Sequence, residues 1–84
     1  MLEIAICDDE TLETSNIEKM LEDLATKVAT KINIDVFYDG STLVDYINRG
    51  KRYDLIYLDI EMEKQNGVDA ARIIRKLDRN VLII

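Results

Sequence analysis

The chain has 84 residues, of which 48% are hydrophobic, and its 11 basic and 17 acidic side chains give a formal net charge of -6. This length suits a single domain with a small core, and the negative charge disfavours direct binding to nucleic acid or to an anionic membrane. The single cysteine and the lack of histidine exclude an intramolecular disulfide, zinc sites built from histidine and cysteine, and histidine-based catalytic triads.

The first predicted strand spans residues 2–7 (LEIAIC), where Cys7 is expected to be a small buried hydrophobic residue. Three acids, Asp8, Asp9 and Glu10, follow the strand directly. The start of the chain has neither the basic segment nor the long apolar segment of a signal peptide. No apolar run approaches the roughly 18 residues of a membrane-spanning helix. We therefore expect a cytoplasmic protein without membrane contact.

Residues 11–30 are predicted to form a helix that packs on a sheet, because apolar residues recur there at spacings of three and four. The residues on this predicted inward face are Ile17, Met20, Leu21, Leu24 and Val28. Residues 34–38 (IDVFY) alternate only weakly between apolar and polar, which favours an edge strand over a central one.

A short second helix is predicted after a turn at Asp39 and Gly40. It spans residues 41–48, with Ser41 as the expected N-cap and Gly50 as the residue that stops it. The side chains expected to point inward are Leu43 and Ile47.

The third predicted strand, residues 54–58, contains the apolar run LIYL and ends at Asp59. A polar loop follows, and residues 68–78 are predicted to form a third helix. Its expected inward residues are Ala70, Ile73, Ile74 and Leu77, and its expected outward residues are Arg72, Arg75, Lys76 and Arg79. Asn80 is expected to end this helix, and residues 81–84 (VLII) to begin a fourth strand.

Strands that alternate with helices at this spacing predict right-handed βαβ units and a parallel sheet. With the second strand at an edge, the predicted strand order is 2-1-3-4, which is the flavodoxin-like, doubly wound α/β arrangement. In such sheets ligands bind outside the carboxyl ends of the strands, at the switch point between the first and third strands. Asp8, Asp9 and Asp59 are therefore predicted to converge.

Converging carboxylates raise one another's pKa and need a neutralising charge. Magnesium (Mg2+) is typically held by one or two carboxylates together with phosphate oxygens, so the three acids indicate magnesium-dependent phosphoryl chemistry. Calcium is disfavoured, because no loop of about 12 residues carries acids at alternate positions. A purely structural interpretation also stands for Asp8, Asp9 and Glu10, since acids at the start of a helix interact favourably with its dipole.

Four segments of the sequence resemble the CheY-like receiver domain of bacterial two-component response regulators. They are IAICDDE at the first strand, FYDG before the second helix, YDLIYLDIEM at the third strand and the NG pair that follows it. The similarity spans the whole chain and rests on the joint spacing of the acidic pair, Asp59 and Gly67. ICDDE together with LDIEM is most similar to the LytR/AgrA type, whose receivers precede a LytTR DNA-binding domain.

The resemblance implies that Asp59 accepts a phosphoryl group from a sensor histidine kinase. It also implies an Mg2+ cofactor bound directly by Asp9, directly or through water by Asp8, and by Asp59 and the backbone carbonyl of Glu61. Gly67 is expected to give the loop before the third helix its backbone freedom. On this interpretation the chain is a phosphoacceptor rather than an enzyme. It would control transcription through a DNA-binding output domain that lies outside residues 1–84.

Two features depart from the family pattern. Glu63 stands where the family usually has a proline, four residues after Asp59, which affects the rigidity of the loop rather than the ligand set. The hydroxyl residue after the fourth strand, the lysine that ends the fifth strand and the whole fifth βα unit are absent. Residues 1–84 therefore look like the N-terminal part of a truncated receiver domain, and we expect autophosphorylation and autodephosphorylation to be impaired.

Two other functions remain open at this point. One is a phospho-independent interaction module of receiver fold, and the other is a hydrolase with a nucleophilic Asp, which would need a second Asp where Glu61 stands. Residues 81–84 also form an apolar strand without charge or proline, and its outer edge favours pairing with another chain. We therefore expect a homodimer through this edge.

Overall fold

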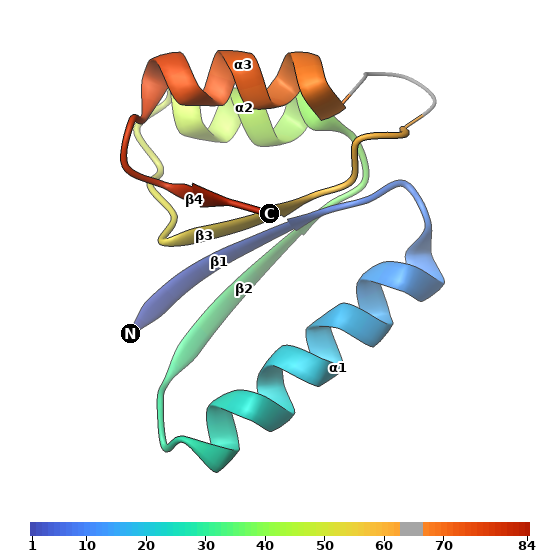
Figure 1. Cartoon of the computed structure of the whole chain (residues 1–84), viewed down its shortest axis with the longest axis vertical. Coiled ribbons are helices and arrows are strands. Elements are labelled where there is room, and N and C mark those ends of the chain that lie inside the picture. Colours follow the sequence, from blue (N-terminus) through green and yellow to red (C-terminus); the bar gives the residue numbers. More distant parts are fainter. Residues whose placement is uncertain (63–66) are drawn as a thin grey trace.

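Four parallel strands alternate with three helices in a computed structural model of the protein, which describes residues 1–62 and 67–84 (Figure 1). In chain order the elements are β1 (Leu2–Cys7), α1 (Thr11–Lys27), β2 (Ile32–Phe37), α2 (Gly40–Asn48), β3 (Leu55–Leu58), α3 (Gly67–Leu77) and β4 (Leu82–Ile83). The predicted alternation is confirmed. The largest boundary difference is at the end of α1, where Ala29 turns into the left-handed region with a φ of 53° and the chain leaves the helix.

The sheet has the predicted order β2-β1-β3-β4, and every neighbouring pair of strands is parallel. At the carboxyl end of β1, Cys7 lies opposite Phe37 of β2 and Leu58 of β3. β2 is an edge strand, as its weak alternation predicts. Because all four strands run in the same direction, their carboxyl ends share one edge of the sheet. The flavodoxin-like fold is therefore confirmed.

The helices form two unequal layers, with α2 and α3 on one face of the sheet and α1 alone on the other (Figure 1). The main core lies between the sheet and the α2 and α3 layer, and Cys7 is fully buried in it, as predicted. The other members of this core are Ala5, Phe37, Leu43, Ile47, Tyr53, Ile56, Leu58, Met62, Ala70, Ile74 and Val81.

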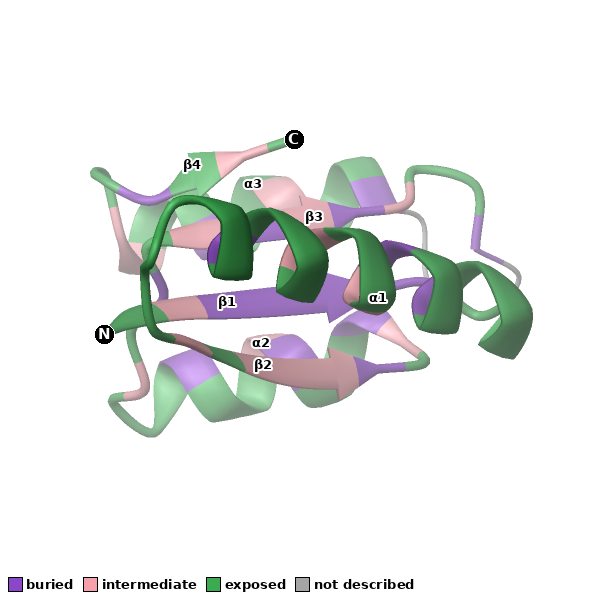
Figure 2. Cartoon of the chain, turned by 90° about the horizontal axis from the view of Figure 1, so that it is seen from below, coloured by how far each residue is buried: buried purple, intermediate pink, exposed green. Residues whose placement is uncertain are grey.

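The inward face of α1 differs from the predicted one. Ile17 is buried and Leu21 is half-buried, but the rest of the buried stripe consists of Thr14 and Ala25. Three residues of the predicted face are exposed, namely Met20 (61%), Leu24 (55%) and Val28 (61%). The physical reason is that no other described helix packs beside α1, so its apolar flank stays open (Figure 2).

The start of α2 also differs from the prediction, because the N-cap is Asp39 rather than Ser41. The Asp39 carboxylate accepts hydrogen bonds from Thr42 N at 2.8 Å and from the Ser41 hydroxyl at 2.6 Å. Ser41 therefore supports the cap from inside the helix. The chain turns after the helix at Gly50, whose φ of 111° favours glycine, as predicted.

α3 buries Ala70 and Ile74 as predicted, whereas Ile73, also predicted to point inward, is 40% exposed. The helix ends at Leu77 rather than near Asn80. Beyond it, Asn80 N donates to Asp78 Oδ1 at 2.9 Å in a turn. Across the described ranges of the chain, no helix is both long enough and apolar enough to cross a membrane.

Candidate functional site

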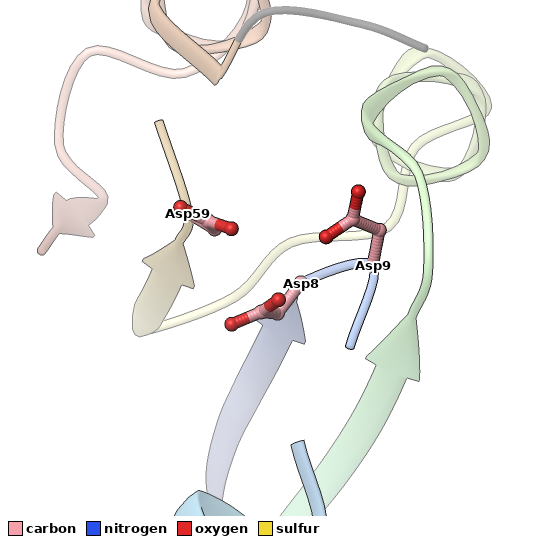
Figure 3. Close-up of side chains that lie close together, drawn as sticks. All are labelled: Asp8, Asp9 and Asp59. Atoms are coloured by element: carbon pink, nitrogen blue, oxygen red, sulfur yellow. The ribbon is translucent and has the colours of Figure 1, made fainter. Parts of the chain in front are cut away.

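Asp8 and Asp9 directly follow β1, and Asp59 directly follows β3, the neighbouring strand. The backbone holds the strand ends in line, since Asp59 N donates to the Cys7 carbonyl oxygen at 2.9 Å and Asp8 N to the Phe37 carbonyl oxygen at 3.1 Å. The three carboxylates gather outside these strand ends (Figure 3). One oxygen from each lies within 4.8 Å of those from the other two. The predicted convergence is confirmed.

Backbone amides orient two of the three carboxylates. Glu10 N donates to Asp8 Oδ1 and Glu61 N donates to Asp59 Oδ1, each at 3.0 Å. Bonds from an aspartate side chain to the amide two residues later are typical of turns. Each bond engages one oxygen, and among residues 1–62 and 67–84 no hydrogen bond engages the second oxygen of Asp8 or of Asp59, which could therefore face a cation or a reacting group.

The potential at the site is strongly negative. Burial raises the pKa of Asp8, which is only 4% exposed, and the charges of Asp59, Asp9 and Glu13 raise it further against the effect of a backbone hydrogen bond. The pKa of Tyr57 on β3 is also raised, first by burial and then by the nearby acids. Glu13, in the first turn of α1, therefore adds to the negative charge at this site. The sequence pattern did not indicate this contribution.

The available donors fit a hard divalent cation, because all three are carboxylate oxygens. The nearest thiol is not a competing ligand. Burial, reinforced by the surrounding acids, raises the pKa of Cys7 to about 12, so the thiol is protonated at neutral pH and is a poor metal ligand and a poor nucleophile. A cation among these oxygens would offset the mutual repulsion of the acids.

Comparison with known proteins assigns the family. A profile of the response regulator receiver domain matches residues 4–84. The chain belongs to the response regulator receiver family. A search of curated proteins gives no match for this receiver.

Solved structures of response regulators superpose on this receiver over nearly its whole length. TrrA from Thermotoga maritima, in complex with Mg(2+)-BeF, is 31% identical with a TM-score of 0.72, and the alignment covers 99% of this chain and 66% of that chain. A complex of the histidine kinase ThkA with TrrA gives 29% identity, a TM-score of 0.67 and the same coverage of 99% and 66%.

A third structure shares the fold at lower identity. It is the N-terminal domain of a response regulator/sensory box/GGDEF protein from Carboxydothermus hydrogenoformans, with 23% identity, a TM-score of 0.83, and coverage of 96% of this chain and 60% of that chain. This receiver chain therefore spans 60 to 66% of the length of the three solved chains.

Gly67 lies at the site of this receiver, but the reason for a glycine there is not the backbone freedom of a loop that the sequence predicted. It is the first residue of α3 rather than a loop residue, and among the described glycines only Gly50 has a positive φ. A Cβ atom at position 67 would overlap the carbonyl oxygen of Asp59 and lie 2.6 Å from the Cα of Ile60. Gly67 is therefore required for the close approach of α3 to the backbone that carries Asp59.

Met62 is a supporting residue that the sequence analysis did not single out. Its side chain is buried, and Cys7 Sγ donates to Met62 Sδ at 3.7 Å. This contact fastens the segment after Asp59 to the end of β1. The available signal was an apolar side chain placed between two glutamates, Glu61 and Glu63, in the sequence.

Two sequence predictions near Asp59 have different outcomes. Glu61 lies close to the site and its amide orients Asp59, but the role of its backbone carbonyl as a ligand stays a prediction. Glu63, the residue in the place of the family proline, lies outside the described residues.

Proposed function

We propose that this receiver accepts a phosphoryl group on Asp59 from a sensor histidine kinase, with Mg2+ held by Asp8, Asp9, Asp59 and the backbone carbonyl of Glu61. The observation that carries the proposal is the approach of three carboxylate oxygens to within 4.8 Å of one another at the carboxyl ends of β1 and β3. This is the place where flavodoxin-like sheets bind ligands.

In the proposed transfer, an oxygen of Asp59 attacks the phosphorus of the kinase phosphohistidine, and the bond between phosphorus and the histidine nitrogen breaks. The amide of Glu61 holds Oδ1 of Asp59, which favours attack by Oδ2. When bound, Mg2+ would supply positive charge opposite the transferring phosphoryl oxygens. The products are aspartyl phosphate and free histidine, so the chain is a phosphoacceptor and not an enzyme with its own substrate.

The kinase and the cofactor are supported by the solved relatives, since TrrA binds Mg(2+)-BeF and forms a complex with the histidine kinase ThkA. For the output we propose a LytTR-type DNA-binding domain, through which the receiver controls transcription. The support for this step is the pairing of ICDDE with LDIEM in the sequence.

The test is intact and peptide mass spectrometry after incubation with acetyl phosphate and magnesium. We expect a single phosphoryl adduct on Asp59 that disappears in EDTA and in Asp59→Asn. Asp69→Asn, which alters an exposed carboxylate on α3, is the matched control and should be labelled like the wild type. An adduct on Asp54 or Asp69, or equal labelling in EDTA, contradicts the proposal.

A homodimer through β4 is a second proposal, favoured by the exposure of this edge strand. Leu82 is 60% exposed and Ile84 is 64% exposed. Within the described chain, β4 pairs only with β3. Its second edge therefore offers backbone groups to another strand.

A further inference from the structure

The outward face of α3 carries four basic side chains, Arg72, Arg75, Lys76 and Arg79, which we call the α3 basic stripe. All four are exposed and together they line one shallow hollow. Their spacing of three, four and seven residues places them on one side of the helix and of the turn that follows it. The stripe lies opposite the face on which α3 buries Ala70 and Ile74.

Part of the stripe has a structural role. The guanidinium of Arg75 donates to the carbonyl oxygen of Arg79 at 3.0 Å and to that of Asp78 at 3.5 Å, which fastens the turn that follows the helix. Basic residues in a last turn also interact favourably with the helix dipole. The two effects together account for Arg75, and the dipole also favours Lys76 in the same last turn, but Arg72 lies one turn earlier, where neither effect applies.

The other three members have charge to offer to a partner. The ion pairs found among residues 1–62 and 67–84 join Arg49 to Asp45 and Lys51 to Glu3 and Asp35. None of these pairs includes the side chain of Arg72, Lys76 or Arg79. The stripe therefore presents exposed positive charge on a protein whose net charge is -6.

The size of the stripe selects the kind of anion that fits it. From Arg72 to Lys76 the helix rises about 6 Å, at roughly 1.5 Å per residue, and Arg79 follows in the turn after the helix. Exposed Asp69 lies before the stripe on α3, and the protein as a whole is acidic. A long polyanion such as duplex DNA, with about one charge per 1.7 Å, extends beyond the stripe and meets this negative surface. A compact anionic partner does not.

The chemistry of the side chains in the stripe suits a partner that presents carboxylates. Three of the four are arginines, whose planar guanidinium groups pair with carboxylates, as with phosphates, through two parallel hydrogen bonds, and the short length of the stripe disfavours a nucleic acid as the source of the anion. Acidic residues spaced by three or four along a helix form a row that matches the spacing of the stripe. We propose that the α3 basic stripe is a docking surface for an acidic helical segment of another protein.

The test uses a fluorescein-labelled helical peptide of about 18 residues, long enough to be helical in water, with its glutamates confined to one face of the two central turns so that the anionic segment stays compact. We expect fluorescence anisotropy to show binding at low salt that weakens as salt is raised. The triple variant Arg72→Gln, Lys76→Gln, Arg79→Gln should weaken binding about tenfold or more, because three exposed charge pairs are lost. Arg75 is retained because its guanidinium holds the turn that follows the helix.

The matched control is Lys19→Gln, Lys27→Gln, Lys31→Gln, which removes the same charge from other exposed positions. It should bind the peptide nearly as well as the wild type, and circular dichroism should show all three proteins folded. A second peptide of the same composition, with its glutamates distributed around the helix, should bind more weakly.

Three results overturn the proposal. They are no binding of the one-faced peptide at low salt, equal loss of affinity in the two triple variants, and equal affinity for the two peptides. Duplex DNA of about 20 base pairs and phosphatidylserine vesicles are tested in parallel. Tighter binding of either one than of the peptide contradicts the choice of a carboxylate partner.

Discussion

At the scale of single residues, Asp8 and Asp59 each combine a structural role with a chemical one. One oxygen accepts the amide two residues later, and this bond fixes the orientation of the other oxygen toward the shared site. The arrangement removes rotational freedom before any ligand arrives, which lowers the entropy cost of binding. The cost is repulsion among three carboxylates.

This repulsion predicts that Asp8→Asn stabilises the metal-free protein at neutral pH. Because burial and neighbouring acids raise the pKa of folded Asp8 above 3.8, its contribution to stability is present below that pH and is lost as the pH rises through the raised value. Urea unfolding at pH 7 without metal should show a gain of about 1 to 3 kcal/mol at low ionic strength. At pH 3 the gain should vanish, and a gain of equal size at both pH values contradicts the assignment.

Magnesium affinity should separate the roles of Asp8 and Asp9. We expect Asp9→Asn to weaken binding more than Asp8→Asn, because Asp9 is the proposed direct ligand and solvent replaces part of a water-bridged contact. Isothermal titration with MgCl2 gives the ranking, with Asp69→Asn as the control that leaves affinity unchanged. A larger loss in Asp8→Asn reverses the two roles.

At the scale of elements, the start of α3 lies directly against the backbone of Asp59 and Ile60. Gly67→Ala places a methyl group against the Asp59 carbonyl oxygen and the Ile60 Cα. We expect a loss of about 1 to 3 kcal/mol in stability, typical of overpacking, together with weaker magnesium binding, because Asp59 must shift. Chemical unfolding and magnesium titration measure the two effects.

Gly50→Ala is the control for this prediction. A Cβ at Gly50 meets no atom within 4 Å, but its φ of 111° is strained for alanine, so it should cost about 1 to 2 kcal/mol. Its magnesium affinity should be unchanged, because Gly50 follows the C-terminal end of α2, whereas the site lies on the side where α2 begins. Equal magnesium affinity in both alanine variants contradicts the positioning role of Gly67.

The sequence was sufficient for the strand order and for the meeting of Asp8 and Asp59, because periodicity and connection length determine both. The sequence did not predict that Leu24 is exposed, because an apolar stripe indicates one face of a helix but not whether another element covers that face. The sequence also did not show why residue 67 is a glycine. A close approach between α3 and β3 arises from tertiary packing, whereas a sequence pattern reports only local preference.

At the scale of the whole molecule, the two faces of the sheet are unequally covered. The α2 and α3 face encloses a buried core, whereas the α1 face has an open apolar groove. The groove is lined by Leu2, Ile4, Leu21, Leu24, Ala25, Val28, Thr30, Ile32 and Leu55. The thinner cover of the α1 face leaves little excess stability for a chain of this length. Association that covers apolar surface should therefore stabilise this protein.

The proposed β4 dimer gives a direct test of this idea. An apolar edge strand pairs readily with a second copy, and a lysine on such an edge opposes pairing. Light scattering coupled to size exclusion should show a mass that rises with concentration toward twice that of the monomer. Leu82→Lys should remain monomeric, whereas Leu12→Lys, at a 73% exposed position on α1, should associate like the wild type. A wild-type protein that stays monomeric and folded at high micromolar concentration contradicts the dimer, and equal loss of association in both lysine variants contradicts its assignment to β4.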